Sequence, residues 1–106
     1  MKKDSALWLL SLARKAGKAE VGAFLSERAI KSGRTNLILL ASDCSGNTKK
    51  KFKNSSEFYG IKYIEYSEMS ELARATGKEN VSVVAICDEN FAKGIENAVA
   101  KTENLN

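Results

Sequence analysis

The 106-residue sequence has no histidine, no proline and only two cysteines. Without histidine, the chain cannot form a Ser-His-Asp or Cys-His catalytic arrangement or the usual zinc sites, and it has no side chain that ordinarily titrates near neutral pH. Cys44 and Cys87 are isolated in the sequence and form no CxxC motif. We therefore expect buried, reduced thiols in preference to a disulfide or a redox pair, and neither a metal, a cofactor nor an enzymatic activity.

Long apolar segments are absent as well. No run approaches the roughly 18 apolar residues that a membrane-spanning helix needs. Two lysines and an acidic residue precede the first apolar stretch, 6–12, and no small-residue cleavage site follows it, so we predict no signal peptide. These features predict a cytoplasmic protein that does not associate with membranes.

The composition that remains is typical of a globular protein. Apolar residues make up 43% of the chain and charged residues 28%, which argues against intrinsic disorder. A chain of this length forms one domain and leaves no room for a second of ordinary size. We therefore expect a single domain over residues 1–106.

The net charge of +4 conceals an uneven distribution. Residues 1–53 contain 12 Lys and Arg against 4 acidic residues, a net charge of +8, whereas residues 54–106 contain 5 against 9, a net charge of −4. Because a basic face attracts polyanions, this asymmetry favours nucleic acid as a partner. An anionic membrane is a weaker alternative, since no basic amphipathic helix has a bulky aromatic side for lipid.

Helical and strand-like apolar patterns alternate along the chain. Gly17, Gly33 and Gly77 stand where helices would end, and unbroken apolar runs bounded by turn residues indicate buried strands. This alternation predicts an α/β domain whose sheet has helices on both faces. The predicted helices are 4–16, 22–32, 48–59, 68–76 and 90–101, and the predicted strands are 36–42, 61–66 and 81–87, with 19–21 as a connector.

The same periodicity predicts which side chains face the core. Leu25 belongs to the inward stripe of the second helix, and Phe52 and Tyr59 face inward from the third. Ser67 stands where an N-cap would start the fourth helix, with acidic residues following in the first turn.

Phosphate-binding and catalytic motifs are weak. Gly17 and Gly22 have the first spacing of a Walker loop, but Ala23 stands where its lysine would be needed. Asp43 and Asp88 each follow a predicted buried strand, where α/β enzymes often hold catalytic or metal-binding carboxylates. Aspartates at such positions also cap helices and form turns, and we favour that interpretation.

Two segments suggest contacts with phosphates. The run 49–53 (KKKFK) places lysines on the outside of a helix, as either a solvated face or a phosphate-binding surface. In the second helix, 100° per residue places Phe24 outside, between Arg28 and Lys31, and free backbone N–H groups at the helix start favour an anion. The Phe24 ring either stacks on a base or packs beneath a neighbouring loop.

Six short segments together form a more specific pattern than any one of them alone. They are 12–18 (LARKAGK), Gly22 with 29–33 (AIKSG), 37–43 (LILLASD), 47–51 (NTKKK), 71–78 (ELARATGK) and 84–88 (VAICD). In this order and spacing they resemble the kink-turn-binding ribosomal protein superfamily (the L-seven-Ae and L-thirty-e group), and most closely its small bacterial YlxQ-like branch. The resemblance covers roughly residues 4–100.

This resemblance implies a three-layer α-β-α sandwich with a four-stranded mixed sheet, and RNA binding without catalysis. Members of the superfamily hold kinked RNA with the start of the second helix and with an apolar loop before the last strand. By position, Gly22 matches the glycine at that helix start, and Arg28 matches a lysine one turn further on. The apolar loop corresponds to Asn80, Val81, Ser82 and Val83.

The chain departs from the family at the polar pair that reads base edges, where Phe24 and Leu25 stand instead. Neither side chain forms hydrogen bonds, so the resemblance implies general attraction to RNA more firmly than kink-turn recognition. The cations that would supply this attraction are Lys15, Lys18, Arg28 and Lys31, with the lysines of 49–51 as further candidates.

Two functional interpretations follow. The first is an RNA-binding protein of the translation apparatus that binds structured, kink-turn-like RNA, either ribosomal or regulatory, with the ribosome as a candidate partner. The alternative is a protein-interaction member of the same fold, for which the acidic second half of the chain offers a surface.

Overall fold

The structure, a computed structural model, describes residues 4–104. The described part has helices and strands in the predicted order, with one strand that the periodicity missed. The helices are α1 (Ser5–Lys15), α2 (Ala23–Lys31), α3 (Gly46–Tyr59), α4 (Met69–Thr76) and α5 (Glu89–Asn104). The strands are β1 (Ala19–Val21), β2 (Leu37–Leu40), β3 (Lys62–Glu65) and β4 (Val83–Ile86).

The strands form one mixed sheet in the order β1-β4-β2-β3. β4 is antiparallel to both of its neighbours, β1 and β2, whereas β2 and β3 are parallel. A parallel pair needs a crossover connection, and α3 provides it between β2 and β3. The four-stranded mixed sheet implied by the family resemblance is confirmed.

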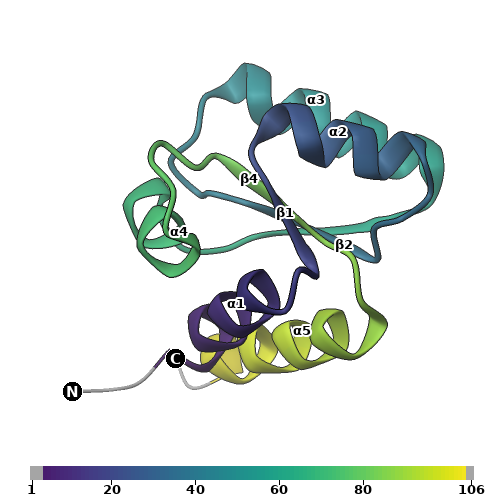
Figure 1. The fold of residues 1–106 in the computed structure, drawn as a ribbon. Coiled ribbons are helices and arrows are strands. Elements are labelled where there is room, and N and C mark those ends of the chain that lie inside the picture. Colours follow the sequence, from purple (N-terminus) through teal and green to yellow (C-terminus); the bar gives the residue numbers. More distant parts are fainter. Residues whose placement is uncertain (1–3, 105–106) are drawn as a thin grey trace.

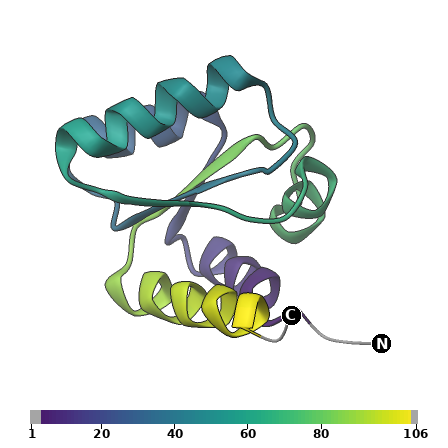
Figure 2. The same ribbon diagram turned by 180° about the vertical axis from the view of Figure 1, so that it is seen from behind.

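Helices cover both faces of the sheet (Figure 1). α2 and α3 lie side by side on one face, which we call the α2–α3 layer, and α1 and α5 form the α1–α5 layer on the other; the view from behind in Figure 2 shows the same arrangement. α4 lies beside the end of the sheet at which α2 and α3 begin. The α-β-α sandwich is therefore confirmed. No helix in the described part is long and apolar enough to cross a membrane.

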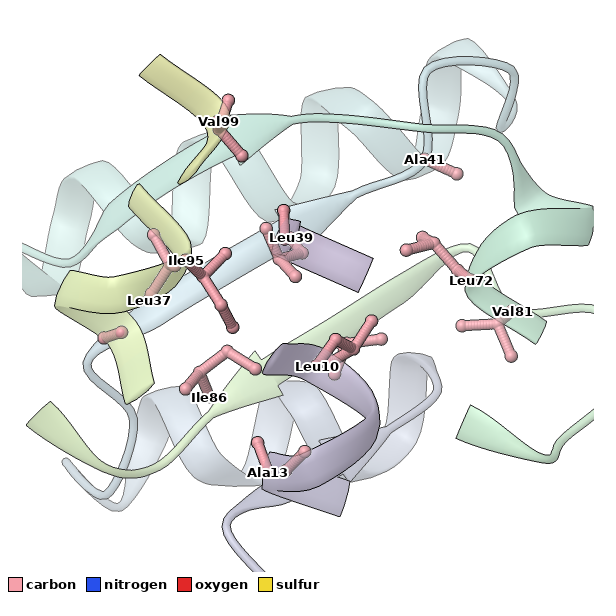
Figure 3. Close-up of a cluster of buried hydrophobic side chains, with 14 of the residues drawn as sticks. Leu10, Ala13, Leu37, Leu39, Ala41, Leu72, Val81, Ile86, Ile95 and Val99 are labelled. Carbon is pink, nitrogen blue, oxygen red and sulfur yellow. The ribbon is translucent and has the colours of Figure 1, made fainter. Parts of the chain in front are cut away.

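Strands β2 and β4 are buried on both faces, which explains their unbroken apolar sequences. Alternate residues point to opposite layers: Leu37 and Leu39 pack toward the α1–α5 layer, and Ile38 and Leu40 pack toward the α2–α3 layer. The larger of the two clusters lies on the α1–α5 side, where side chains of α1, α4 and α5 meet those of the sheet (Figure 3).

Both aspartates that follow strands have structural roles. Asp88 accepts a hydrogen bond from the Phe91 N–H at 2.9 Å, at the start of α5. Asp43 accepts one from the Met69 N–H at 2.8 Å, at the start of α4. Among the described residues, no group of three His, Cys, Asp or Glu side chains could hold a metal ion. The capping interpretation of Asp43 and Asp88 is confirmed.

Two local predictions are wrong. Residues 19–21 are not a connector but strand β1, which three residues are too few to reveal by alternation. Ser67 is not the N-cap of α4, because Glu68 takes that position and forms a capping box with Glu71. Ser67 has a φ of 69°, and its hydroxyl donates a hydrogen bond to the Glu71 carboxylate at 2.6 Å.

The inward stripes of α2 and α3 also differ from the prediction. Ser26 is fully buried in α2 while Leu25 is only half-buried, and in α3 Ser56 is fully buried while Tyr59 is 46% exposed. Buried polar groups usually have a hydrogen-bond partner, which the Ser26 hydroxyl has and the Ser56 hydroxyl lacks among the described residues. The Ser26 hydroxyl donates to the Glu20 carbonyl at 3.4 Å, which links α2 to β1.

Both cysteines are free, with Cys44 buried and Cys87 half-buried. Burial raises the pKa of each thiol above its ordinary value. Because the thiolate is the reactive form, a raised pKa lowers the reactivity of both residues at neutral pH. The predicted burial holds for Cys44, whereas Cys87 is more exposed than predicted.

Candidate nucleic-acid interface

Helix α2 begins at a glycine whose backbone conformation other residues rarely adopt. Gly22 has φ 104° and ψ 163°, and its N–H donates a hydrogen bond to the Val83 carbonyl at 2.9 Å. This bond holds the start of α2 against β4. No side chain caps the helix, so the N–H groups of its first turn are available to an anion.

Helices α2, α3 and α4 all begin at the same end of the sheet, but the hydrogen bonds that cap their first turns differ. At α3, the Ser45 side chain accepts a hydrogen bond from the Thr48 N–H at 3.1 Å. At α4, the carboxylates of Asp43 and Glu68 both accept backbone N–H groups, and their negative charge offsets the positive end of the helix dipole. Of these three, α2 therefore offers an anion the best backbone site.

Phe24 lies in the first turn of α2 and points away from the core. It is 72% exposed, so its predicted outward position is confirmed. The Arg28 guanidinium carbon lies 5.8 Å from the centre of the Phe24 ring, within the range of a cation–π contact. The pair places an aromatic surface and a fixed positive charge beside the uncapped N–H groups.

The loop before β4 reaches the same end of the sheet, but two of its four predicted RNA contacts are buried. Val81 is 1% exposed and Val83 is 0% exposed, and each packs in a core cluster. Their prediction as residues whose side chains contact bases is wrong, because Val83 lies in the central strand β4 and Val81 packs in the same cluster as Leu72 of α4. Asn80 is exposed and Ser82 is half-buried, so these two side chains remain as candidates.

Backbone hydrogen bonds hold four loops together at this end. The Ala41 N–H donates to the Ser82 carbonyl at 2.8 Å. The Ser42 N–H and hydroxyl both donate to the Ser67 carbonyl, each at 2.8 Å. With the bond from Gly22 to β4, these contacts join the loops β1–α2, β2–α3, β3–α4 and α4–β4. We call the region of Gly22, Ala41, Ser42, Ser67 and Ser82 the loop end of the sheet.

Three of the predicted cations lie toward the opposite end. Lys15 and Lys18 flank the turn between α1 and β1, and the Lys18 carbonyl accepts a hydrogen bond at 2.7 Å from the Cys87 N–H, just beyond the end of β4. The four residue steps from Lys18 to Gly22 cover about 13 Å of extended chain. Lys31 is the last residue of α2 and also lies toward this opposite end of the sheet. The predicted site therefore divides between the two ends of the sheet.

The lysine run 49–53 does not form one uniform surface. Lys49 donates a hydrogen bond from Nζ to the Ser42 carbonyl at 2.6 Å and pairs with Glu65 at 3.3 Å, so it ties α3 to the loop end and β3. Lys51 pairs with Glu27 of α2 at 3.5 Å. The remaining lysines of the run, Lys50 and Lys53, are exposed.

Glu27 is part of this surface, and the sequence prediction did not include it. Its carboxylate lies 3.5 Å from the Lys51 Nζ and 3.9 Å from the Lys31 Nζ. The i, i+4 spacing to Lys31 is visible in the sequence, but the contact with Lys51 depends on how α2 packs against α3. Glu27 therefore positions two cations and lowers the positive charge of the α2–α3 layer.

Comparison with known proteins shows a family relationship. The sequence matches the model of the ribosomal protein L7Ae/L30e/S12e/Gadd45 family over residues 4–96. The chain belongs to this family. It is 38% identical over 84 residues to RNA-binding protein YlxQ of Bacillus subtilis (strain 168), which covers 79% of this chain and 84% of that protein. It is 34% identical over 91 residues to RNA-binding protein YlxQ of Enterococcus faecium, with 86% and 87% covered. Within the L7Ae family it falls in the YlxQ-like branch.

Solved structures confirm the fold of this family member. A protein of unknown function from Bacillus halodurans C superposes with a TM-score of 0.88 at 28% identity and covers 92% of this chain and 99% of that one. The Giardia lamblia 15.5kD RNA binding protein superposes with a TM-score of 0.77 at 19% identity, with 96% and 88% covered. The L7Ae-like architecture thus extends over nearly the whole chain.

The two residues at which the resemblance implied a departure from the family, Phe24 and Leu25, lie in the first turn of α2. Phe24 is exposed, and Leu25 is half-buried and lies outside both core clusters. Neither side chain can donate or accept a hydrogen bond. The chemistry of this helix start suits base stacking and phosphate binding better than the reading of base edges.

Proposed function

We propose that this protein binds structured RNA through the start of α2, as a cytoplasmic RNA-binding protein of the translation apparatus that acts without catalysis. One observation carries the proposal: uncapped N–H groups, the exposed Phe24 and the adjacent Arg28 lie together at a single helix start. The relatives named RNA-binding protein YlxQ support RNA as the partner.

Each group has a separate part in binding. The first N–H groups of α2 and the Arg28 guanidinium hold phosphates, and an unpaired or terminal base stacks on Phe24. Asn80 and Ser82 add polar contacts from the neighbouring loop, which the Gly22–Val83 hydrogen bond keeps beside the helix start. Lys31, Lys15 and Lys18 attract the RNA at longer range from the far end of the sheet.

The favoured target is kink-turn-like RNA, ribosomal or regulatory, recognised with reduced discrimination. A kink exposes unstacked bases, which suit an aromatic platform. Phe24 and Leu25 do not read base edges, so we expect a kink-turn to be preferred over a straight duplex by less than several hundredfold. Because Leu25 lies outside the core clusters, replacing the pair with Asn and Glu should sharpen that preference and leave the fold intact.

The test is a titration against a kink-turn RNA and a straight duplex of matched length at two salt concentrations. If about four phosphates are neutralised, affinity should fall roughly a hundredfold between 50 and 200 mM salt. Arg28→Ala should lower the affinity for both RNAs and should reduce the slope of log affinity against log salt concentration by about one unit. Lys93→Ala on the α1–α5 layer should leave both the affinity and this slope unchanged. A flat salt response, together with a stable complex with a protein partner, would instead establish the protein-interaction interpretation.

A further inference from the structure

The end of α3 carries an exposed aromatic pair that the start of α2 does not use. Phe58 is 82% exposed, and the adjacent Tyr59 is 46% exposed. Their ring centres lie 5.0 Å apart, with the ring planes at 78°, an edge-to-face contact. Rings that remain in water contribute little to folding. A binding role therefore explains this pair better than a role in stability.

This pair lies at the far end of the α2–α3 layer from Phe24. α2 and α3 both begin near the loop end and run in the same direction, as Figures 1 and 2 show. Twelve residue steps separate Gly46 from Phe58, which corresponds to about 18 Å of helix. The two aromatic sites thus mark opposite ends of one continuous helical layer.

The surface between the two aromatic sites is positively charged. On α3, Lys51, Asn54 and Phe58 follow one another at i, i+3 and i+7 and share a face. Arg28 and Lys31 lie on the exposed side of α2. The acidic residue between the helices, Glu27, is already paired with two lysines. This combination of cations and flanking aromatic rings complements a chain of phosphates and bases.

We propose that Phe58 and Tyr59 form a second stacking site, which takes unpaired bases of an RNA strand that continues from the α2 start along the α2–α3 layer. This proposal rests on the function proposed above. At about 3.4 Å per stacked nucleotide, five or six nucleotides span the roughly 18 Å of α3 between its start and Phe58. An apolar protein surface would also cover the aromatic pair, but the basic charge of the layer favours a polyanion.

The experiment compares three RNAs. One is a stem without overhangs, and the other two are the same stem with a single-stranded extension of eight uridines at either the 5′ end or the 3′ end. The unchanged protein should bind one extended RNA more tightly than the blunt stem. Phe58→Ala should lower its affinity for that RNA by about 5- to 150-fold and leave its affinity for the blunt stem unchanged. Phe58→Trp retains a stacking surface and should keep the added affinity.

Phe24→Ala separates this proposal from the proposed function. It should weaken binding of blunt and extended RNAs alike, because it acts at the stem. If Phe24→Ala has no effect while Phe58→Ala still does, the α2 site is wrong and the α3 site stands. If neither extension adds affinity, or if Phe58→Ala alters only self-association or a protein complex, the second stacking site is refuted. Since Phe58 is 82% exposed, the circular dichroism melting curve of the variant should match that of the parent.

Discussion

The two helical layers differ in how much of the core they cover and in which side chains they expose. The α1–α5 layer packs against the larger cluster of buried side chains, and the α2–α3 layer packs against the smaller one. The two most exposed large apolar side chains, Phe24 and Phe58, both lie on the α2–α3 layer. So do the exposed cations Arg28, Lys31, Lys50, Lys51 and Lys53. Most of the core therefore supports one layer, and the RNA surface that we propose lies on the other.

This separation implies that stability and binding respond to different substitutions. A truncated side chain beneath the α1–α5 layer should change the free energy of unfolding, and a truncated side chain on the outside of the α2–α3 layer should change RNA affinity. A substitution that changed both the free energy of unfolding and the RNA affinity would contradict this separation. The exception is a residue that joins a layer to the sheet at the binding site.

The largest effect is expected for Ile95→Ala in α5. Ile95 is fully buried in the larger cluster (Figure 3), so its truncation should lower the free energy of unfolding by about 2–5 kcal/mol. Urea denaturation measures this loss. RNA affinity, measured where the variant is folded, should equal that of the parent; a tenfold loss would show that the α1–α5 layer contributes to binding.

Gly22→Ala should affect both quantities, because Gly22 joins the start of α2 to β4. Nothing lies within 4 Å of an added Cβ, so the cost comes from the backbone conformation, about 1–3 kcal/mol of unfolding free energy. The strain should also disturb the first turn of α2 and weaken RNA binding. Gly46→Ala is the matched control: its Cβ also has open space, and no positive φ is found there. Equal destabilisation by the two substitutions would contradict this explanation.

Phe24→Ala should change binding alone. Loss of a stacked base costs about 1–3 kcal/mol of binding free energy, and the melting temperature should not change because the side chain is 72% exposed. Fluorescence anisotropy with several structured RNAs should show a similar loss for each, since stacking tolerates any base. A loss confined to one RNA sequence would mean that this position reads bases.

Glu27→Gln should give the smallest effect, and in the opposite direction. Removing this negative charge frees Lys31 and Lys51 for phosphates, so RNA affinity should rise a few-fold at 50 mM salt and less at 200 mM. The exposed ion pairs that are lost contribute at most about 1 kcal/mol each to stability. Glu96→Gln is a close control, because Glu96 is paired with Lys62 at 2.8 Å and has similar side-chain exposure, 27% against 28%. Equal gains from both variants would remove any special role of Glu27.

Much of the arrangement of the two layers can be predicted from the sequence. The unbroken apolar runs of β2 and β4 predict strands buried on both faces, and a sheet with two covered faces requires two helical layers. Helical periodicity places Phe24 outside and beside Arg28. The position of Asp88 directly before a predicted helix predicts its hydrogen bond to the start of α5, whereas the bond between Asp43 and α4 depends on tertiary packing. In each of the predicted cases the signal is local and strong.

Other features depend on tertiary packing that local patterns do not reveal. β1 has only three residues, so pairing with β4 makes it a strand. Ser26 lies in the core in place of Leu25, and its hydroxyl donates a hydrogen bond to the Glu20 carbonyl. The resemblance assigned Val81 and Val83 to an RNA-contacting loop, but Val83 is buried in the central strand β4 and Val81 in the cluster that includes Leu72 of α4.

The central claim is that RNA meets the α2–α3 layer at the start of α2. Its most direct test is a titration of the ¹⁵N-labelled protein with a kink-turn RNA, followed by backbone amide chemical shifts. The largest changes should occur at Ala23, Phe24 and Arg28, and amides of α5 such as Ile95 should keep their positions. If the largest changes instead fall on α1 and α5, with the amides of α2 unmoved, the claim is contradicted.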